Sequence, residues 1–197
     1  KNFLTVCNEA NITLMNEMGY TVNDYTNAYL KSIEVALKPN IASGKKVSLL
    51  TQPKKYASED PQALTDGALG GSNFYSNWLG FEGNHLEAVI DLEKPEDIST
   101  ISTAFLQVTN HVVFYPENVT YYGSIDGKSY LKLGTVLNKA PLNKGSKVND
   151  IQYFDLDITP SKYRYIKIKA ENLKTAPYWH HAAGTPSWIF ADEVIID

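Results

Sequence analysis

Two short segments of the 197-residue chain gather side chains that could do chemistry, and the first of them is aromatic. The stretch TAPYWHHAAGTPSWI, residues 175–189, contains Tyr178, Trp179, His180, His181 and Trp188. Aromatic rings stack on the CH faces of sugar rings, while histidine can hydrogen-bond sugar hydroxyls. The alternative is that the rings cover one end of the core, and Trp188, which immediately precedes a strand-like run, fits that alternative best.

The second segment, LTDGALGGSN at residues 64–73, concentrates oxygen-bearing groups around glycines. Calcium takes about six to eight oxygen ligands, many of them backbone carbonyls, and a loop of this kind can wrap around the ion. An Asx-turn, in which Asp66 accepts hydrogen bonds from backbone amides, would use the same residues without a metal. The residues alone leave both interpretations open.

The motifs of the common catalytic chemistries are missing from the sequence. No HExxH spacing, GxSxG elbow, P-loop or dinucleotide-binding fingerprint occurs. A glycosidase needs two carboxylates flanking a cleft. The acidic residues pair only as neighbours in strand-like runs, where adjacent side chains point to opposite faces. We therefore expect a binding module and not an enzyme.

Charge and composition narrow the possible partners. The net charge is −4, with 18 basic and 22 acidic residues spread along the chain, so no basic stripe is present to bind nucleic acid. No apolar run approaches the roughly 20 residues that a membrane-spanning helix needs. The single cysteine, Cys7, cannot form an internal disulfide. The chain begins at Lys1 without a methionine, which we interpret as a piece of a longer protein.

From residue 41 onward, short strand-like runs alternate with turn signals, of which Asp126-Gly127 is a strong hairpin signal. Long amphipathic helical patterns are missing after residue 40, which argues against a parallel α/β sheet. The pattern favours an antiparallel sandwich with function on its end loops. The expected strands are residues 47–51, 86–92, 98–108, 119–125, 130–136, 151–158, 163–170 and 188–196.

Six motifs occur in a characteristic order: ALTDG at 63–67, NWLGF at 77–81, LEAVIDL at 86–92, VTYYGSIDG at 119–127, RYIKI at 164–168 and DEV at 192–194. This order resembles an F5/8 type C, or discoidin-like, domain, many of which are family 32 carbohydrate-binding modules. The segment 179–190 is most similar to modules at the C-terminus of chitobiase-like β-hexosaminidases of gut Bacteroidetes. The resemblance covers residues 40–197 and leaves residues 1–39 as a leading segment, interpreted as the tail of a preceding domain.

The resemblance implies an all-β fold, an eight-stranded antiparallel jelly-roll β-sandwich that is galactose-binding-domain-like. It also implies a structural calcium ion near the Asp-Gly loop and the C-terminal glutamate. In this sequence Asp66 and Glu193 match those positions. Further oxygens would come from Leu64, Ala68, Ser72 or Asn73.

The resemblance further implies a shallow glycan site on the end loops. The candidate residues are Trp179, His180, His181, Tyr75, Trp78 and Asn110. Many sugar-binding members place an arginine in a loop, whereas the single arginine here, Arg164, lies in a strand-like run.

The function that follows is a non-catalytic module that targets an attached glycosidase to galactose- or N-acetylhexosamine-type glycans, which it binds weakly. That glycosidase is expected to be secreted, periplasmic or at the cell surface, with its catalytic domain in the same polypeptide. The alternative is a structural or protein-interaction domain of the same fold that binds no sugar.

Overall fold

Antiparallel strands make up nearly all of the regular structure. The computed structural model describes residues 40–54, 58–71, 75, 77–139 and 150–197, which belong to one unit, Asn40–Asp197. The leading segment, residues 1–39, lies outside the described residues. No helix in the described part of the chain is long and apolar enough to cross a membrane.

The described residues contain strands and two short 3-10 helices, with no α-helix among them. The strands are β1 (Lys46–Leu49), β2 (Leu79–Glu82), β3 (Leu86–Gln107), β4 (Asn118–Ser124), β5 (Leu131–Leu137), β6 (Asp150–Tyr153), β7 (Leu156–Ala170) and β8 (Trp188–Ile196). The 3-10 helices are η1 (Pro61–Leu64) and η2 (Thr109–His111).

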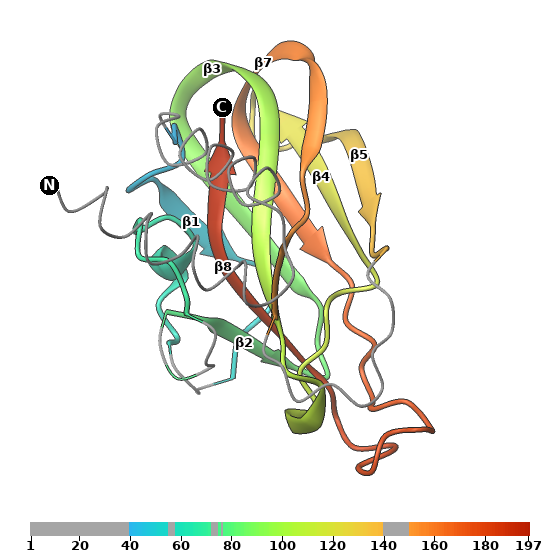
Figure 1. Ribbon diagram of the computed structural model, residues 1–197. Helices are drawn as coiled ribbons and strands as arrows, with labels where there is room; N and C mark the ends of the chain where they lie inside the picture. Colours follow the sequence, from blue (N-terminus) through green and yellow to red (C-terminus); the bar gives the residue numbers. More distant parts are fainter. Residues whose placement is uncertain (1–39, 55–57, 72–74, 76, 140–149) are drawn as a thin grey trace, which may run out of the picture. The chain divides into compact units, whose positions relative to one another are not determined.

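The long strand β3 takes part in both layers of the sandwich (Figure 1). Its first half pairs with β1 and with the end of β7, which is followed by β4 and then β5. Its second half pairs first with the start of β7 and then with β8 and β6, and β8 pairs with β2. All of these ladders are antiparallel, so the predicted all-β sandwich is confirmed.

The core lies between the two layers, and every second side chain along a strand points into it, because side chains alternate between the two faces of a strand. Leu86, Ala88, Ile90 and Leu92 of β3 are fully buried. They belong to one hydrophobic cluster with residues of β7 and β8. Burial of apolar surface at about 25 cal/mol per Å² is the main force that holds the layers together.

Several boundaries differ from the sequence prediction, among them the strand expected over residues 151–158, which is divided between β6 and β7. The turn expected after residue 92 is a bulge inside a continuous β3, where the register with β7 shifts between Asp91 and Glu96 and Glu93 has a φ of 73°. Pro160 does not end a strand, because β7 continues through it to Ala170. Bulges bend a strand and increase its twist, which carries β3 from one layer into the other.

Strand β2 was missing from the prediction because its sequence, LGFE, is short and contains a glycine. The structure explains that glycine. A Cβ atom at Gly80 would lie 2.9 Å from the ring of Phe190 on the paired strand β8. The pairing of β2 with β8 therefore depends on a contact that the local sequence does not reveal.

Candidate functional site

The aromatic segment forms a short looped hairpin between β7 and β8, which projects from one end of the sandwich (Figure 1). Its base is closed by an isolated bridge between Thr175 and Pro186. The Ala176 N–H donates to the Thr185 carbonyl at 2.8 Å, and the Gly184 N–H donates to the Ala176 carbonyl at 3.0 Å. We call residues 176–185 the aromatic loop.

The tip of the aromatic loop presents rings to solvent. The Tyr178 side chain is 89% exposed, and His181 is also exposed. Trp179 is half-buried, with its ring edge-on to Phe114 at a centroid distance of 6.1 Å. The exposed His181 ring lies against the ring of the buried His180, at a centroid distance of 4.2 Å.

His180 is buried and anchors the aromatic loop to η2. Its Nδ1 accepts a hydrogen bond from the Ala182 N–H at 3.1 Å, so Nε2 carries the proton and donates to the Thr109 carbonyl at 2.7 Å. Both ring nitrogens are occupied, so the prediction that His180 hydrogen-bonds a sugar is wrong. Its contact instead joins the loop to the helix that carries the exposed Asn110.

The prediction for Trp78 is also corrected. Its side chain is fully buried in a second cluster with Leu106, Val108 and Phe190, and Nε1 donates to the Gly71 carbonyl at 3.0 Å. A ring without solvent exposure has no face to offer a sugar. Tyr75, by contrast, is 71% exposed and keeps a surface on which a ligand could stack.

The glycine-rich segment passes directly over the Trp78 ring. A Cβ atom at Gly70 would lie 2.3 Å from the indole, so only glycine permits this approach. Beneath the same loop lie two acidic residues of β8, Asp192 and Glu193, which are only 1% and 3% exposed.

These two buried carboxylates are partnered mainly by backbone amides. Both Glu193 oxygens accept from the Gly67 N–H at 3.1 Å, and Oε1 also accepts from the Asn40 amide at 3.4 Å. One oxygen of Asp192 accepts from the Gly70 N–H, whereas its buried Oδ1 has no hydrogen-bond partner. None of the ion pairs among the described residues includes either group.

The surroundings of these carboxylates disfavour their charged forms. The pKa of Asp192 is raised to about 6 and the pKa of Glu193 to about 7, mainly by burial. The Asp192 carboxylate contributes to the rise at Glu193, and the nearby Asp66 carboxylate contributes to both. The hydrogen bonds from Gly70 and Gly67 act in the opposite direction and only partly offset the burial. Two adjacent negative charges are therefore costly here unless a positive charge accompanies them.

This arrangement predicts a pH dependence in protein freed of metal ions. The unfolded chain ionises both groups near about pH 4. The folded chain keeps their protons until about pH 6 and about pH 7. The contribution of Asp192 and Glu193 to the free energy of unfolding should therefore fall as the pH rises from about 4 to about 7.

Denaturant unfolding across this range, in chelator, measures the effect. The double variant Asp192→Asn/Glu193→Gln should lack this fall. The lowered pKa values of Asp91, Asp126 and Glu171 make the free energy of unfolding rise with pH in both proteins. Subtracting the profile of the double variant from that of the wild type removes this shared contribution. Identical pH profiles for the two proteins would contradict the assignment.

The remaining predicted calcium ligands lie on the same loop. Asp66 is exposed and its Oδ1 accepts from the Ala68 N–H at 2.8 Å, which is the Asx-turn that the sequence allowed. Leu64 is buried and Ala68 is half-buried. Ser72 and Asn73 lie outside the described residues. In the described ranges, no group of three or more His, Cys, Asp or Glu side chains could hold a metal ion.

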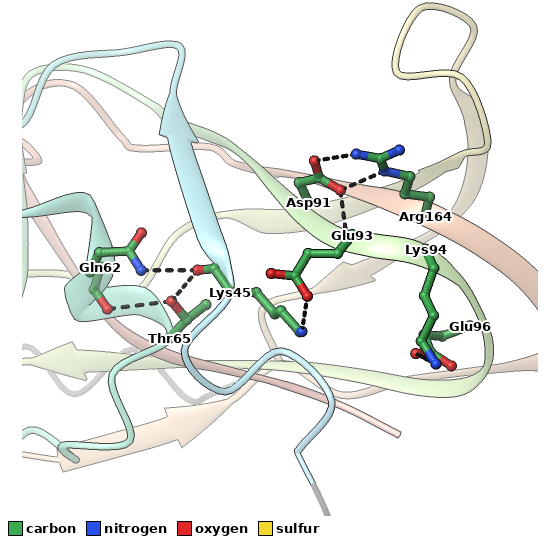
Figure 2. A network of polar contacts seen from close by, with 8 residues as sticks. All are labelled: Lys45, Gln62, Thr65, Asp91, Glu93, Lys94, Glu96 and Arg164. Carbon is green, nitrogen blue, oxygen red and sulfur yellow. Dashed lines mark hydrogen bonds and ion pairs between the residues drawn. The ribbon is translucent and has the colours of Figure 1, made fainter.

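Hydrogen bonds join η1 and the start of the glycine-rich segment to Lys45, the residue before β1 (Figure 2). The Lys45 carbonyl accepts from Gln62 Nε2 at 3.1 Å and from Thr65 Oγ1 at 2.8 Å. Figure 2 also shows the single arginine, Arg164, which donates to both oxygens of Asp91 at 2.8 and 2.9 Å. Arg164 thus links β7 to β3 and serves the scaffold.

Sequence reasoning missed the roles of two residues. The sequence analysis gives Asp192 no role of its own, yet its buried Oδ1, which has no hydrogen-bond partner, is the most unusual polar feature of β8. The available signal was the pair Asp192-Glu193 in the otherwise apolar strand WIFADEVII. Asn172, at the base of the aromatic loop, has no signal in the sequence.

Comparisons with known proteins extend the description of the fold. Neither a family model nor a curated protein matches the sequence. Chitosan-binding module 1 of a chitosanase/glucanase from Paenibacillus sp. IK-5 is similar with a TM-score of 0.52 at 12% identity, covering 81% of this chain and 99% of that chain. CpGH89CBM32-5 from Clostridium perfringens, in complex with GalNAc-β-1,3-galactose, gives 0.50 at 12% identity and covers 81% and 99%.

A third similar structure is a Ruminococcus gnavus GH29 fucosidase in complex with fucose. Its TM-score is 0.53 at 13% identity, and the match covers 88% of this chain and 29% of that chain. At these identities the likeness establishes the fold. The chain has the antiparallel, galactose-binding-domain-like β-sandwich that carbohydrate-binding modules also use.

Proposed function

We propose that residues 40–197 are a non-catalytic carbohydrate-binding module whose glycan site is the tip of the aromatic loop together with η2. The observation that carries the proposal is Tyr178, which is 89% exposed on a loop fixed to the sandwich by His180. The exposed side chains of His181 and Asn110 lie on the two elements that this contact joins. An aromatic face beside polar groups is the chemistry that sugar rings require.

The site is shallow, which sets the expected affinity. Contact with one or two sugar rings gives about −4 to −6 kcal/mol, or a Kd of about 1 mM to about 0.05 mM. Weak binding of this order suffices for a module that keeps a catalytic domain near its substrate, since linkage raises the effective concentration.

The proposed ligands are galactose- or N-acetylhexosamine-type glycans. Support comes from CpGH89CBM32-5, which has the same fold and is in complex with GalNAc-β-1,3-galactose. The fucosidase match, in which a domain of this fold occupies under a third of a longer chain, supports an attached glycosidase. We propose a secreted, periplasmic or cell-surface enzyme of the chitobiase-like kind for that partner.

We also propose a structural calcium ion beneath the glycine-rich loop. The fit rests on the buried Oδ1 of Asp192, an acceptor without a partner, beside the buried carboxylate of Glu193. Glu193 and Asp66, the two acidic ligands that the sequence predicted, together with backbone carbonyls of the loop, would supply oxygen ligands of the kind that calcium prefers, while Asp192 adds to the negative charge. A bound cation would offset the buried negative charge and fix the loop over Trp78.

A glycan-array screen of the chain, with and without EDTA, tests the proposed function. Binding to galactose- or N-acetylhexosamine-bearing glycans is the expected outcome, and loss of binding in EDTA would show that the metal supports the site. A folded chain that binds no glycan on the array would contradict the proposal. The structural or protein-interaction role would then be the better account.

A further inference from the structure

The base of the aromatic loop is closed around one buried side chain, Asn172, which is 2% exposed. Its Nδ2 lies 3.1 Å from the Phe81 carbonyl, 3.0 Å from the Asn84 carbonyl and 3.1 Å from the Ser187 carbonyl, so its two N–H groups are shared among the three acceptors. These carbonyls belong to the end of β2, the turn that follows it and the residue before β8. One amide group therefore joins the segment 81–84 to Ser187, which is about a hundred residues away in the sequence.

The other polar atoms of Asn172 are also used. Its Oδ1 accepts from the Lys174 N–H at 3.0 Å and from Ser187 Oγ at 2.7 Å. Its backbone N–H donates to Nδ1 of His85 at 3.0 Å. A buried amide with every partner in place is a strong constraint, because no bond can break without leaving a buried group unpaired.

The bond to Lys174 determines how the chain enters the aromatic loop. Lys174 has a φ of 70°, a left-handed conformation that is unfavourable for a residue with a Cβ atom. Its carbonyl accepts from the Ser187 N–H at 3.0 Å, which closes the loop one pair below the Thr175–Pro186 bridge. Asn172 contacts both members of that closing pair and stabilises the strained one.

We infer that Asn172 is the positioning residue of the aromatic loop: its side chain fixes the loop at the base, as His180 fixes it at the tip. The relevance of this role to sugar rests on the proposed function. With both anchors present, Tyr178 is displayed on a preformed loop, so that little ordering is required when a ligand binds. Loss of the base anchor frees the loop while the strands of the sandwich keep their pairing.

Amide hydrogen exchange followed by NMR tests the role without any ligand. In Asn172→Ala, the loop amides of Ala176, Gly184 and Ser187 should exchange at least about tenfold faster than in the wild type, as expected for loss of more than about one net hydrogen bond. Amides of the central strands β3 and β7 should change far less, because these strands do not depend on the loop.

A second variant and a control keep the test decisive. Ser187→Ala removes only one of the bonds to Asn172, so it should fold and give a smaller change confined to the same amides. Asn118→Ala removes an amide that donates to Glu171 at 3.1 Å and should leave the loop amides unchanged. If the exchange rates of the loop and strand amides rise together, or if the exchange rates of the loop amides do not change in either variant, the inference is wrong.

The outcome can be separated from that of the proposed function. If a glycan binds the wild type, its Kd should rise at least about tenfold in Asn172→Ala, the ratio that about 1.4 kcal/mol represents. If the wild type binds no glycan, the exchange experiment still decides whether Asn172 positions the loop.

Discussion

Calcium is expected to raise the melting temperature of the chelator-treated protein by about 5–10 °C. A free calcium concentration of about 100 times the Kd adds about 2.7 kcal/mol to the free energy of unfolding. Each kcal/mol raises the melting temperature of a domain of this size by about 2–4 °C. The physical reason is that the buried carboxylates of Asp192 and Glu193 form no ion pair with a cationic side chain of the described residues. Thermal unfolding in EDTA, in excess calcium and in excess magnesium measures the effect.

The variant Glu193→Gln should lose most of this calcium response. In EDTA it should melt at the same temperature as the wild type or higher, because a desolvated charge has been removed and glutamine can still accept from the Gly67 N–H. Glu87→Gln, in the other layer of the sandwich, is the matched control and should keep the full response. Equal melting of the wild type in EDTA and in calcium would contradict the calcium proposal.

The second large effect is expected for glycan binding. Tyr178→Ala and Trp179→Ala should each reduce the affinity at least about tenfold, which places a millimolar binder beyond detection, because aromatic rings supply most of the energy at such sites. Tyr178 is 89% exposed, so its replacement should leave the melting temperature unchanged. Titration calorimetry with a glycan identified on the array measures both variants.

Trp179 needs a more careful interpretation, because its ring also contacts Phe114 and His180. Its loss would loosen the loop as well as remove a stacking surface. Tyr153→Ala is a suitable control, since Tyr153 is a partly exposed tyrosine on β6. Wild-type affinity in both loop variants would move the glycan site away from the aromatic loop, with exposed Tyr75 the next candidate.

The fold was largely predictable because its signals are local. Alternation in β3 and β7 and the Asp126-Gly127 hairpin identify strands from a few neighbouring residues. Asp126 accepts from the amides of Lys128 and Ser129, which is why that turn is so well marked. The sequence predicts a turn where β3 has a bulge, because proline and acidic residues are compatible with both kinds of structure.

The candidate site was less predictable because its decisive contacts are between distant residues. The role of His180 depends on a carbonyl 71 positions away, at Thr109. The burial of Trp78 depends on the loop that crosses its ring, and the same loop contacts one oxygen of Asp192 but leaves the buried Oδ1 without a partner. Residue type predicted which side chains suit sugar or calcium, whereas only the fold decides which of them remain accessible.

The most direct test of the central proposal is an NMR titration of the ¹⁵N-labelled chain with galactose and with N-acetylgalactosamine, each to about tenfold above a millimolar Kd. We expect saturable shifts of the amides of residues 178–182 and 109–111, with the central strands unaffected. Shifts that do not saturate with either sugar, or saturable shifts that leave both of these segments unchanged, would contradict a glycan site on the aromatic loop.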